Sequence, residues 1–309
     1  MTEIMSKHEK NKKTKIRDGR QDKIFNIVNH TLLILFLIIE LYPLIYIVSC
    51  SFSAGDALVS GKVKLLPVNF TLDGYATVFE YKSMWSGFKN SVVYTVSGTI
   101  IGVILTILAA YPLSRPDLKG RKVVMSLFLF TMMFNGGMIP SYLLLKNLHM
   151  LDTIWAIILP TTLTAYHVIV ARTFFSQNIP TELLEAAQMD GCSDFGFFRR
   201  IAVPLSMPII AVLALWIAIA LWNGYFNPMI YLSTESKYPL QLVLRRVLLL
   251  SQVDMTEAMV DPERYQRNKY MSEVLKYGMI VISSLPLMMI YPFAQKYFVQ
   301  GVMIGSVKG

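Results

Sequence analysis

The segment 176–204 carries the residues whose types and spacing are most specific for a function. It holds an acidic residue before two alanines, then a glycine, a phenylalanine pair and a proline. These candidate residues are Glu185, Ala186, Ala187, Asp190, Gly191, Phe197, Phe198 and Pro204. Pro180 precedes a helix-forming run, and glycine often ends a helix by adopting a positive φ. We therefore expect two short helices that meet at Gly191, where a positive φ or a close approach is needed. Ala186 and Ala187 would allow close backbone contact, and the phenylalanine pair would form an apolar knob.

No pattern of catalytic or metal-binding residues is present in the sequence. The two cysteines, Cys50 and Cys192, have no zinc-site spacing, and we expect them on opposite sides of a membrane, where they cannot pair. The nearest approach to a phosphate-binding loop runs from Gly55 to Lys62. It has five residues between its glycines instead of four, and no Ser or Thr follows the lysine. We expect no catalytic residue, no metal site and no cofactor in this chain.

A second group of polar and aromatic residues lies within long apolar stretches. Glu40 is in the middle of the first stretch, where a carboxylate is a functional candidate by default, although a structural contact is the favoured reading. His167 has two readings, an interhelical hydrogen bond or, less favoured, a proton relay. Asn135 interrupts the third stretch, and a broken helix either lines a cavity or marks a packing kink. Trp222 and Asn223, late in the fifth stretch, complete the candidates for lining a pathway.

Long apolar stretches must position these residues. Hydrophobic residues make up 54% of the 309-residue chain and charged residues only 16%, against about 25% in soluble domains. A spanning helix needs about 20 apolar residues. Each such stretch must be helical, because lipid offers the backbone no hydrogen-bond partners. We therefore predict an all-α membrane protein with six transmembrane helices. They lie at about 28–52, 90–114, 123–145, 154–175, 203–232 and 276–298. The first stretch is too long for the core of a cleaved signal peptide.

Basic residues orient these spans. The segment 1–26 is rich in Lys and Arg, and 115–122 has four basic residues in eight positions. Because cytoplasmic loops carry such an excess, both termini and 176–202 should be cytoplasmic, with 53–89 and 233–275 outside. The net charge of +9 does not indicate a nucleic-acid partner, because the basic segments lie beside spans and lack interleaved aromatic residues.

The spacing around 185–204 resembles the EAA loop of ABC-importer permeases, with Val203 where that family usually has leucine. Segments 238–245 and 291–309 are similar to the polysaccharide and multiple-sugar branch of the maltose-type permeases. The resemblance implies a type I ABC-importer permease fold in 27–298, with a core at about 88–296 and a cytoplasmic tail at 299–309. It implies that the 176–204 loop couples this chain to an ATPase.

The same resemblance implies the partners. They are a second homologous permease, two ATPase subunits that bind ATP and Mg²⁺, a solute-binding protein outside the bacterial plasma membrane, membrane lipid and an oligosaccharide. The outer 233–275 segment would contact the binding protein. Three alternatives stay open: the same architecture with a peptide or polyamine substrate, a secondary transporter driven by an ion gradient, and a structural assembly subunit. Of the carboxylates that an ion-coupled transporter would need within its spans, only Glu40 lies near a span centre.

Overall fold

The computed structural model describes residues 19–250 and 262–306, which are almost entirely helical. No strand occurs in these two ranges, where Ser53 and Phe70 form an isolated antiparallel bridge. The N-terminal half contains α1 (Arg20–Ser51), α2 (Gly55–Val59), α3 (Asp73–Glu80), α4 (Lys82–Ser114), α5 (Arg121–Met133) and α6 (Met138–Asn147). It is followed by α7 (Trp155–Thr162), α8 (Ala165–Asn178), α9 (Thr181–Met189) and α10 (Asp194–Phe197). A π-helical turn (Phe198–Ala202) leads to α11 (Val203–Leu205), α12 (Met207–Asn223), α13 (Phe226–Tyr231), α14 (Leu240–Leu250) and α16 (Pro262–Ser306).

The expected set of six apolar stretches is confirmed, but only three of them are continuous helices. Helices α1 and α4 and the part Lys269–Pro292 of α16 are each long and apolar enough to cross a membrane. The other three stretches are bent pairs, α5 with α6, α7 with α8, and the α10–α11 region with α12, and six crossings result if each pair forms one span. The described residues therefore fit a six-span bundle in which half of the spans are broken.

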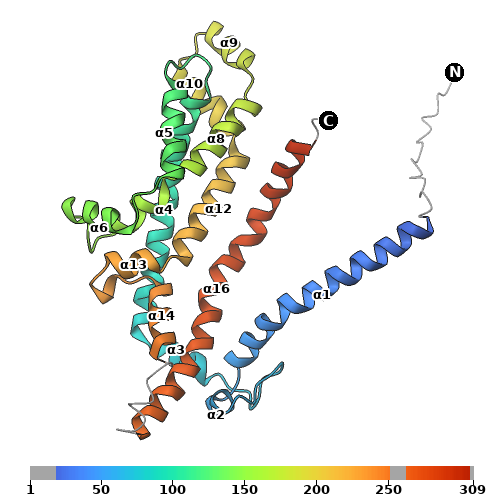
Figure 1. Cartoon of the computed structure of the whole chain (residues 1–309), viewed down its shortest axis with the longest axis vertical. Coiled ribbons are helices and arrows are strands. Elements are labelled where there is room, and N and C mark those ends of the chain that lie inside the picture. Colours follow the sequence, from blue (N-terminus) through green and yellow to red (C-terminus); the bar gives the residue numbers. More distant parts are fainter. Residues whose placement is uncertain (1–18, 251–261, 307–309) are drawn as a thin grey trace, which may run out of the picture.

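The largest break corrects the prediction of one span over 123–145. Helices α5 and α6 meet at 115°, so α6 turns away from the direction of α5 (Figure 1). Gly137 has a φ of 84° and a ψ of −176°, a conformation that side chains other than glycine rarely adopt. The side-chain oxygen of Asn135 accepts a hydrogen bond of 2.8 Å from the Gly137 amide. Asn135 therefore stabilises the turn itself. A bend of 115° is larger than a packing kink within one helix.

Helix α4 lies at the centre of the bundle, packed against α7, α8, α12 and α14. One face of α4 is buried at intervals of three or four residues, from Met84 through Tyr94 and Gly102 to Ala110. At Gly102 a Cβ atom would lie 2.9 Å from the Cβ of Thr162 on α7. Small residues permit such close backbone approach between membrane helices. Because glycine occupies this contact, α7 can pack directly on α4 and place its polar end beside α12.

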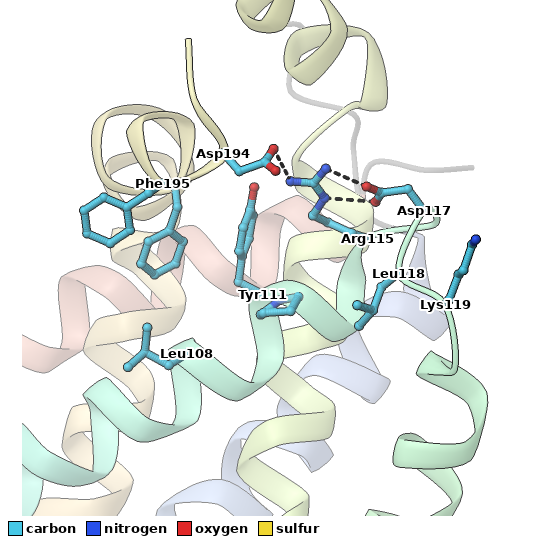
Figure 2. A pocket seen from close by; sticks show the side chains of 10 residues that line it. Leu108, Tyr111, Arg115, Asp117, Leu118, Lys119, Asp194 and Phe195 are labelled. Carbon is cyan, nitrogen blue, oxygen red and sulfur yellow. Dashed lines mark hydrogen bonds and ion pairs between the residues drawn. The ribbon is translucent and has the colours of Figure 1, made fainter.

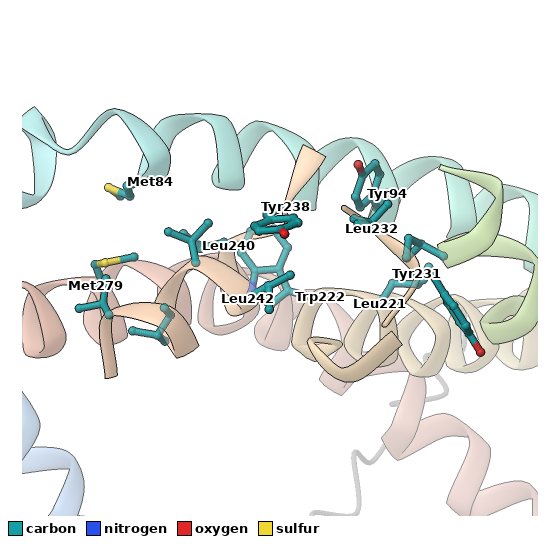
Figure 3. Packing of buried hydrophobic residues seen from close by; sticks show 14 of the residues in the cluster. Met84, Tyr94, Leu221, Trp222, Tyr231, Leu232, Tyr238, Leu240, Leu242 and Met279 are labelled. Atoms are coloured by element: carbon teal, nitrogen blue, oxygen red, sulfur yellow. The ribbon is translucent and has the colours of Figure 1, made fainter. Parts of the chain in front are cut away.

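The segment 233–275 is mostly helical where it is described, which corrects the expectation of a long polar loop. Leu240 and Leu242 of α14 are buried where this helix packs on α4 and α16 (Figure 3), and Val247 of the same helix is buried as well. Helix α16 begins at Pro262, well before the predicted start of the sixth span. The charged residues of this segment led to its interpretation as a loop. Its apolar residues nevertheless recur at the helical period, which is typical of an amphipathic helix. The polar stretch 251–261 lies outside the described residues.

Helix α1 stands apart from the rest of the bundle (Figure 1). Its buried residues are Ser49, Cys50 and Ser51 at its C-terminal end, and it packs there near α16. The apolar side chains from Ile24 to Ile45 are otherwise exposed in this chain. A helix of this composition with no cover from its own chain meets either lipid or another protein within the membrane.

Candidate functional site

The predicted elbow is present between α8 and α12. Helix α9 begins directly after Pro180, and Gly191 follows it with a φ of 76°. The hydroxyl of Ser193 then caps α10 by accepting a hydrogen bond from the Gly196 amide. No atom lies within 4 Å of the position of a Cβ at Gly191, so a close approach does not explain the glycine. Its left-handed backbone conformation does, because residues with a Cβ disfavour that region.

The two faces of α9 differ sharply in exposure. Leu184 and Ala187 are buried in the core at this end of the bundle. Glu185, Ala186 and Asp190 are exposed, as is Pro204 beyond the second short helix. The elbow is therefore anchored by its apolar face and presents its acidic face outward. This arrangement leaves Glu185 and Asp190 accessible to a second protein.

The structure corrects the expectation that Phe197 and Phe198 form an outward knob. Phe197 is 1% exposed and lies in the core. Phe198 is half-buried, with its ring centroid 4.9 Å from that of Tyr111 on α4. The most exposed large apolar residues of the elbow are instead Met189, at 89%, and Phe195, at 68%. Three phenylalanines, Phe195, Phe197 and Phe198, lie within four positions. The sequence alone does not indicate which of their rings turns inward.

An ionic contact fixes the elbow to the α4–α5 connection. The Nη1 atom of Arg115 lies 2.7 Å from Oδ1 of Asp194, and its Nη2 atom lies 2.6 Å from Oδ2 of Asp117 (Figure 2). The hydrogen bond from Arg115 lowers the pKa of Asp117 below its usual value. The three side chains border a pocket of about 440 Å³ with an apolar floor that includes Leu108 and Phe198. The start of α10 is thereby tied to the end of α4.

A second candidate site lies where α12 ends. The helix stops at Asn223, and α13 begins at Phe226 after Gly224 and Tyr225. This break borders a pocket of about 230 Å³. Its lining combines amides, hydroxyls, aromatic rings and aliphatic side chains: Ile157, Thr161, Ala220, Leu221, Asn223, Gly224, Tyr225, Phe226, Asn227 and Pro228. Irregular backbone within a membrane is tolerated only where protein or a water-filled cavity meets it, so this break is a candidate site for the pathway.

One face of α12 continues from this pocket toward the middle of the bundle. Trp216, Ala220 and Asn223 are spaced by four and three residues, which places them on one side of the helix. The ring centroid of Trp216 lies 5.8 Å from that of His167, in a stacked arrangement, and 5.6 Å from that of Tyr166. Both residues belong to the start of α8, beyond its break from α7. Tyr166 and Trp216 were missed as candidates. The spacing of Trp216 from Asn223 would have indicated Trp216, whereas Tyr166 is brought to it only by the packing of α8 on α12.

The remaining pathway candidates lie elsewhere. Trp222 is 4% exposed, and its Nε1 atom donates a hydrogen bond of 3.0 Å to the carbonyl oxygen of Ser283 on α16. It therefore packs in the core instead of lining a pathway. Glu40 is exposed on α1, and Asn135 shapes the α5–α6 turn. Neither of them lines the pocket at Asn223.

Asp152 ties the segment that follows α13 to the connection between α6 and α7. Its carboxylate accepts hydrogen bonds from the amides of Ser233 and Thr234 and from the Thr234 hydroxyl, and its Oδ2 atom lies 2.6 Å from Nζ of Lys237. The ion pair with Lys237, and then Thr234 and Ser233, hold the pKa of Asp152 well below its usual value. The segment that follows α13 is thus tied to the α6–α7 connection.

We expect Asp152→Asn to lower stability by about 1 kcal/mol at neutral pH, because the charged partner of Lys237 is lost in a largely solvated place. A carboxyl whose folded-state pKa is depressed stabilises above its unfolded value of about 3.9 and loses that effect as the pH falls further. The gap in apparent Tm between the wild type and Asp152→Asn should therefore stay constant from pH 8 to 5 and shrink below about pH 4. The matched control is Glu80→Gln, at an exposed carboxylate without a described ion pair. An equal loss in both variants, or a gap unchanged at pH 3, would contradict this role of Asp152.

Comparison with known proteins identifies the family to which this chain belongs. Residues 98–304 match the family model of the binding-protein-dependent transport system inner membrane component. The chain belongs to this family. A polygalacturonan/rhamnogalacturonan transport system permease protein of Bacillus subtilis is 39% identical over 94% of this chain and 100% of its own length. Protein LplC of the same organism is 40% identical over 95% of this chain and 98% of its own.

A solved structure has the same fold. It is a chain of a bacterial ABC transporter involved in the import of the acidic polysaccharide alginate, with a TM-score of 0.82 and 38% identity. The match covers 91% of this chain and 99% of that one. The fold is thus that of an ABC-importer permease, as the sequence resemblance implied. The chain is a membrane-spanning transport component and not the catalytic subunit.

Proposed function

We propose that this chain and a second homologous permease form the membrane pathway of an ABC importer for an oligosaccharide. The polar break at the end of α12 carries the assignment, because its amides and aromatic rings can bind the hydroxyl groups and apolar faces of sugars. The polysaccharides in the names of the related proteins support a saccharide as the substrate. The exposed face of α1 fits contact with a second permease in the membrane. The position of Glu40 on this helix, apart from the pocket, disfavours an ion-coupled mechanism.

The elbow would couple this pathway to its energy source. Two ATPase subunits would bind ATP and Mg²⁺, and one of them would receive the exposed face around Glu185, Met189 and Phe195. Because Phe197 and Arg115 tie the elbow to the bundle, a rigid-body movement of the ATPase can pass to α4 and α12 and change the access of the pocket. A solute-binding protein outside the membrane would deliver the sugar, which agrees with the family description.

Uptake in a deletion strain tests the pathway role. Cells that lack this chain but keep the second permease, the ATPases and the binding protein should lose uptake of labelled oligosaccharides, and a plasmid copy should restore it. A transport-inactive but correctly assembled variant would then exclude a purely structural subunit. Restored uptake of peptides or polyamines but of no oligosaccharide would overturn the proposed substrate class.

The proposed topology places the elbow and both termini in the cytoplasm. The elbow and the C-terminal end of α16 lie in the same half of the molecule (Figure 1). We expect an impermeant maleimide to label Cys192, which is partly exposed, in opened membranes but not in intact cells. Cys50 is buried and serves as the internal control that stays unlabelled in both. Labelling of Cys192 from outside intact cells would reverse the topology.

A further inference from the structure

Arg245 does not itself line the α12–α13 pocket, but its guanidinium packs on a residue that does and has no carboxylate partner among the described residues. Arg245 belongs to α14, and its Cζ atom lies 4.6 Å from the ring centroid of Tyr225, a residue that lines the pocket. Its Nε atom is buried without a hydrogen-bond partner. It forms no ion pair with any carboxylate in 19–250 or 262–306. A partly desolvated cation in this state favours an anionic ligand, because an unpaired buried polar group is costly.

Neighbouring cations are already neutralised. Arg246, the next residue on α14, also covers a tyrosine ring, at 4.5 Å from Tyr238, but it is paired with Glu235. Lys237 is paired with Asp152. Of these three basic residues, Arg245 is therefore the one whose charge no described carboxylate neutralises, and its position on the Tyr225 ring is held by a cation–π contact.

The lining of the pocket suits a sugar that carries a carboxylate. Asn223 and Asn227 supply amides that can both donate to and accept from hydroxyl groups. Tyr225 and Phe226 supply aromatic faces for the apolar side of a pyranose ring. A guanidinium presents its N–H groups in a planar fork that matches a carboxylate with two parallel hydrogen bonds. A neutral sugar would use the amides and rings and leave Arg245 unpaired.

We propose that Arg245, positioned by Tyr225, is a specificity-determining residue that makes this permease prefer oligosaccharides of uronic acids. This proposal rests on the function proposed above and adds the chemical class of the substrate. The carboxylate of one sugar unit would pair with Arg245 while that unit lies in the pocket at the end of α12. The rate of passage, and not only delivery by the binding protein, would then depend on the negative charge of the sugar.

The test uses the complete importer in proteoliposomes with its own binding protein. The substrates are galacturonate and mannuronate trisaccharides, each as the free acid and as the neutral methyl ester, together with a neutral arabinose trisaccharide. The wild type should import a free acid faster than its ester. Arg245→Gln should raise the KM for the free acid by about tenfold or more, because a charged hydrogen-bonded pair is lost. Arg245→Lys, which keeps the charge without the fork, should give a smaller rise for the acid alone.

Arg246→Gln is the matched control, because it removes the same charge one position away from a cation that Glu235 already neutralises. It should change the KM for the free acid by less than about threefold, a small effect for an exposed pair. Basal ATP hydrolysis shows that each variant is assembled, and Arg245→Lys decides the question if Arg245→Gln assembles poorly. Equal effects of the two glutamine variants on the acid, or a wild type that prefers the esters or the arabinose trisaccharide, would overturn the proposal. Import of no oligosaccharide at all would instead refute the function on which it rests.

Discussion

Gly191→Val should yield a permease that inserts and assembles but loses at least about tenfold of its substrate-stimulated ATP hydrolysis. The expected loss comes from backbone strain and not from a steric clash, because Gly191 has a φ of 76° and open space around the position of a Cβ. A residue with a Cβ pays about 1–3 kcal/mol in this region, and a β-branched one is the least tolerated. The exposed elbow can relieve that strain by changing its turn, which would displace α10 relative to α9. The measurements are the amount of ATPase that copurifies with the complex and its stimulated turnover.

Gly191→Asn is the matched control, because asparagine adopts the left-handed conformation more readily than other residues that carry a Cβ. It should keep most of the turnover even though its side chain is larger than a hydrogen atom. Glu185→Lys probes the same surface by charge, and we expect it to weaken ATPase retention if Glu185 makes a charged hydrogen bond worth about 1.5–3 kcal/mol. A Gly191→Val complex with its full ATPase complement and normal stimulated turnover would show that the elbow does not couple.

Much of this fold follows from apolar length and basic loops, because both are local properties of the sequence. The six stretches were predicted from apolar length, and the helix–glycine–helix elbow from a helix-forming run between Pro180 and Gly191; both are present. Breaks within spans were harder to predict. The 115° turn between α5 and α6 depends on Gly137 and on the hydrogen bond from its amide to Asn135, and a hydropathy window does not register either. Helix α14 was missed because its charged residues masked an apolar face that packs on α4.

Some residues of the candidate sites were likewise predictable from local patterns, and others were not. Gly191 was identified from its spacing, because a positive φ at a helix end has a local signature. The inward turn of Phe197 and the burial of Trp222 depend on contacts with α4, α8 and α16, which are distant in the sequence. Arg245 was not among the candidates for a similar reason, because its neighbour Tyr225 lies 20 positions earlier, in the break between α12 and α13. Residue type and spacing therefore predicted the local geometry, and packing decided which side chains are available to partners.

Phe197→Ala should lower the stability of the permease, whereas Phe195→Ala should leave stability unchanged and weaken its binding to the ATPase. Phe197 is fully enclosed near Phe175, Ala187 and Ala202, so its truncation should cost about 3–5 kcal/mol and reduce the amount of assembled permease. Phe195 is 68% exposed at the rim of the pocket beside Asp194 (Figure 2), so its truncation should change stability by less than about 0.5 kcal/mol. If the exposed ring is buried by the ATPase, Phe195→Ala should nonetheless lower ATPase retention by about tenfold, the usual loss for an aromatic residue at the centre of an interface.

Phe70→Ala is the control for exposure, because Phe70 is 69% exposed between α2 and α3, away from the elbow. It should leave ATPase retention unchanged. The measurements are the apparent Tm of the purified permease complex and the ratio of ATPase to permease after affinity purification at moderate salt. A lower Tm with normal retention for Phe195→Ala would mean that its ring supports the bundle instead of the partner. Normal stability of Phe197→Ala would contradict its place in the core, and with it the rigid attachment through which the elbow is expected to move α4 and α12.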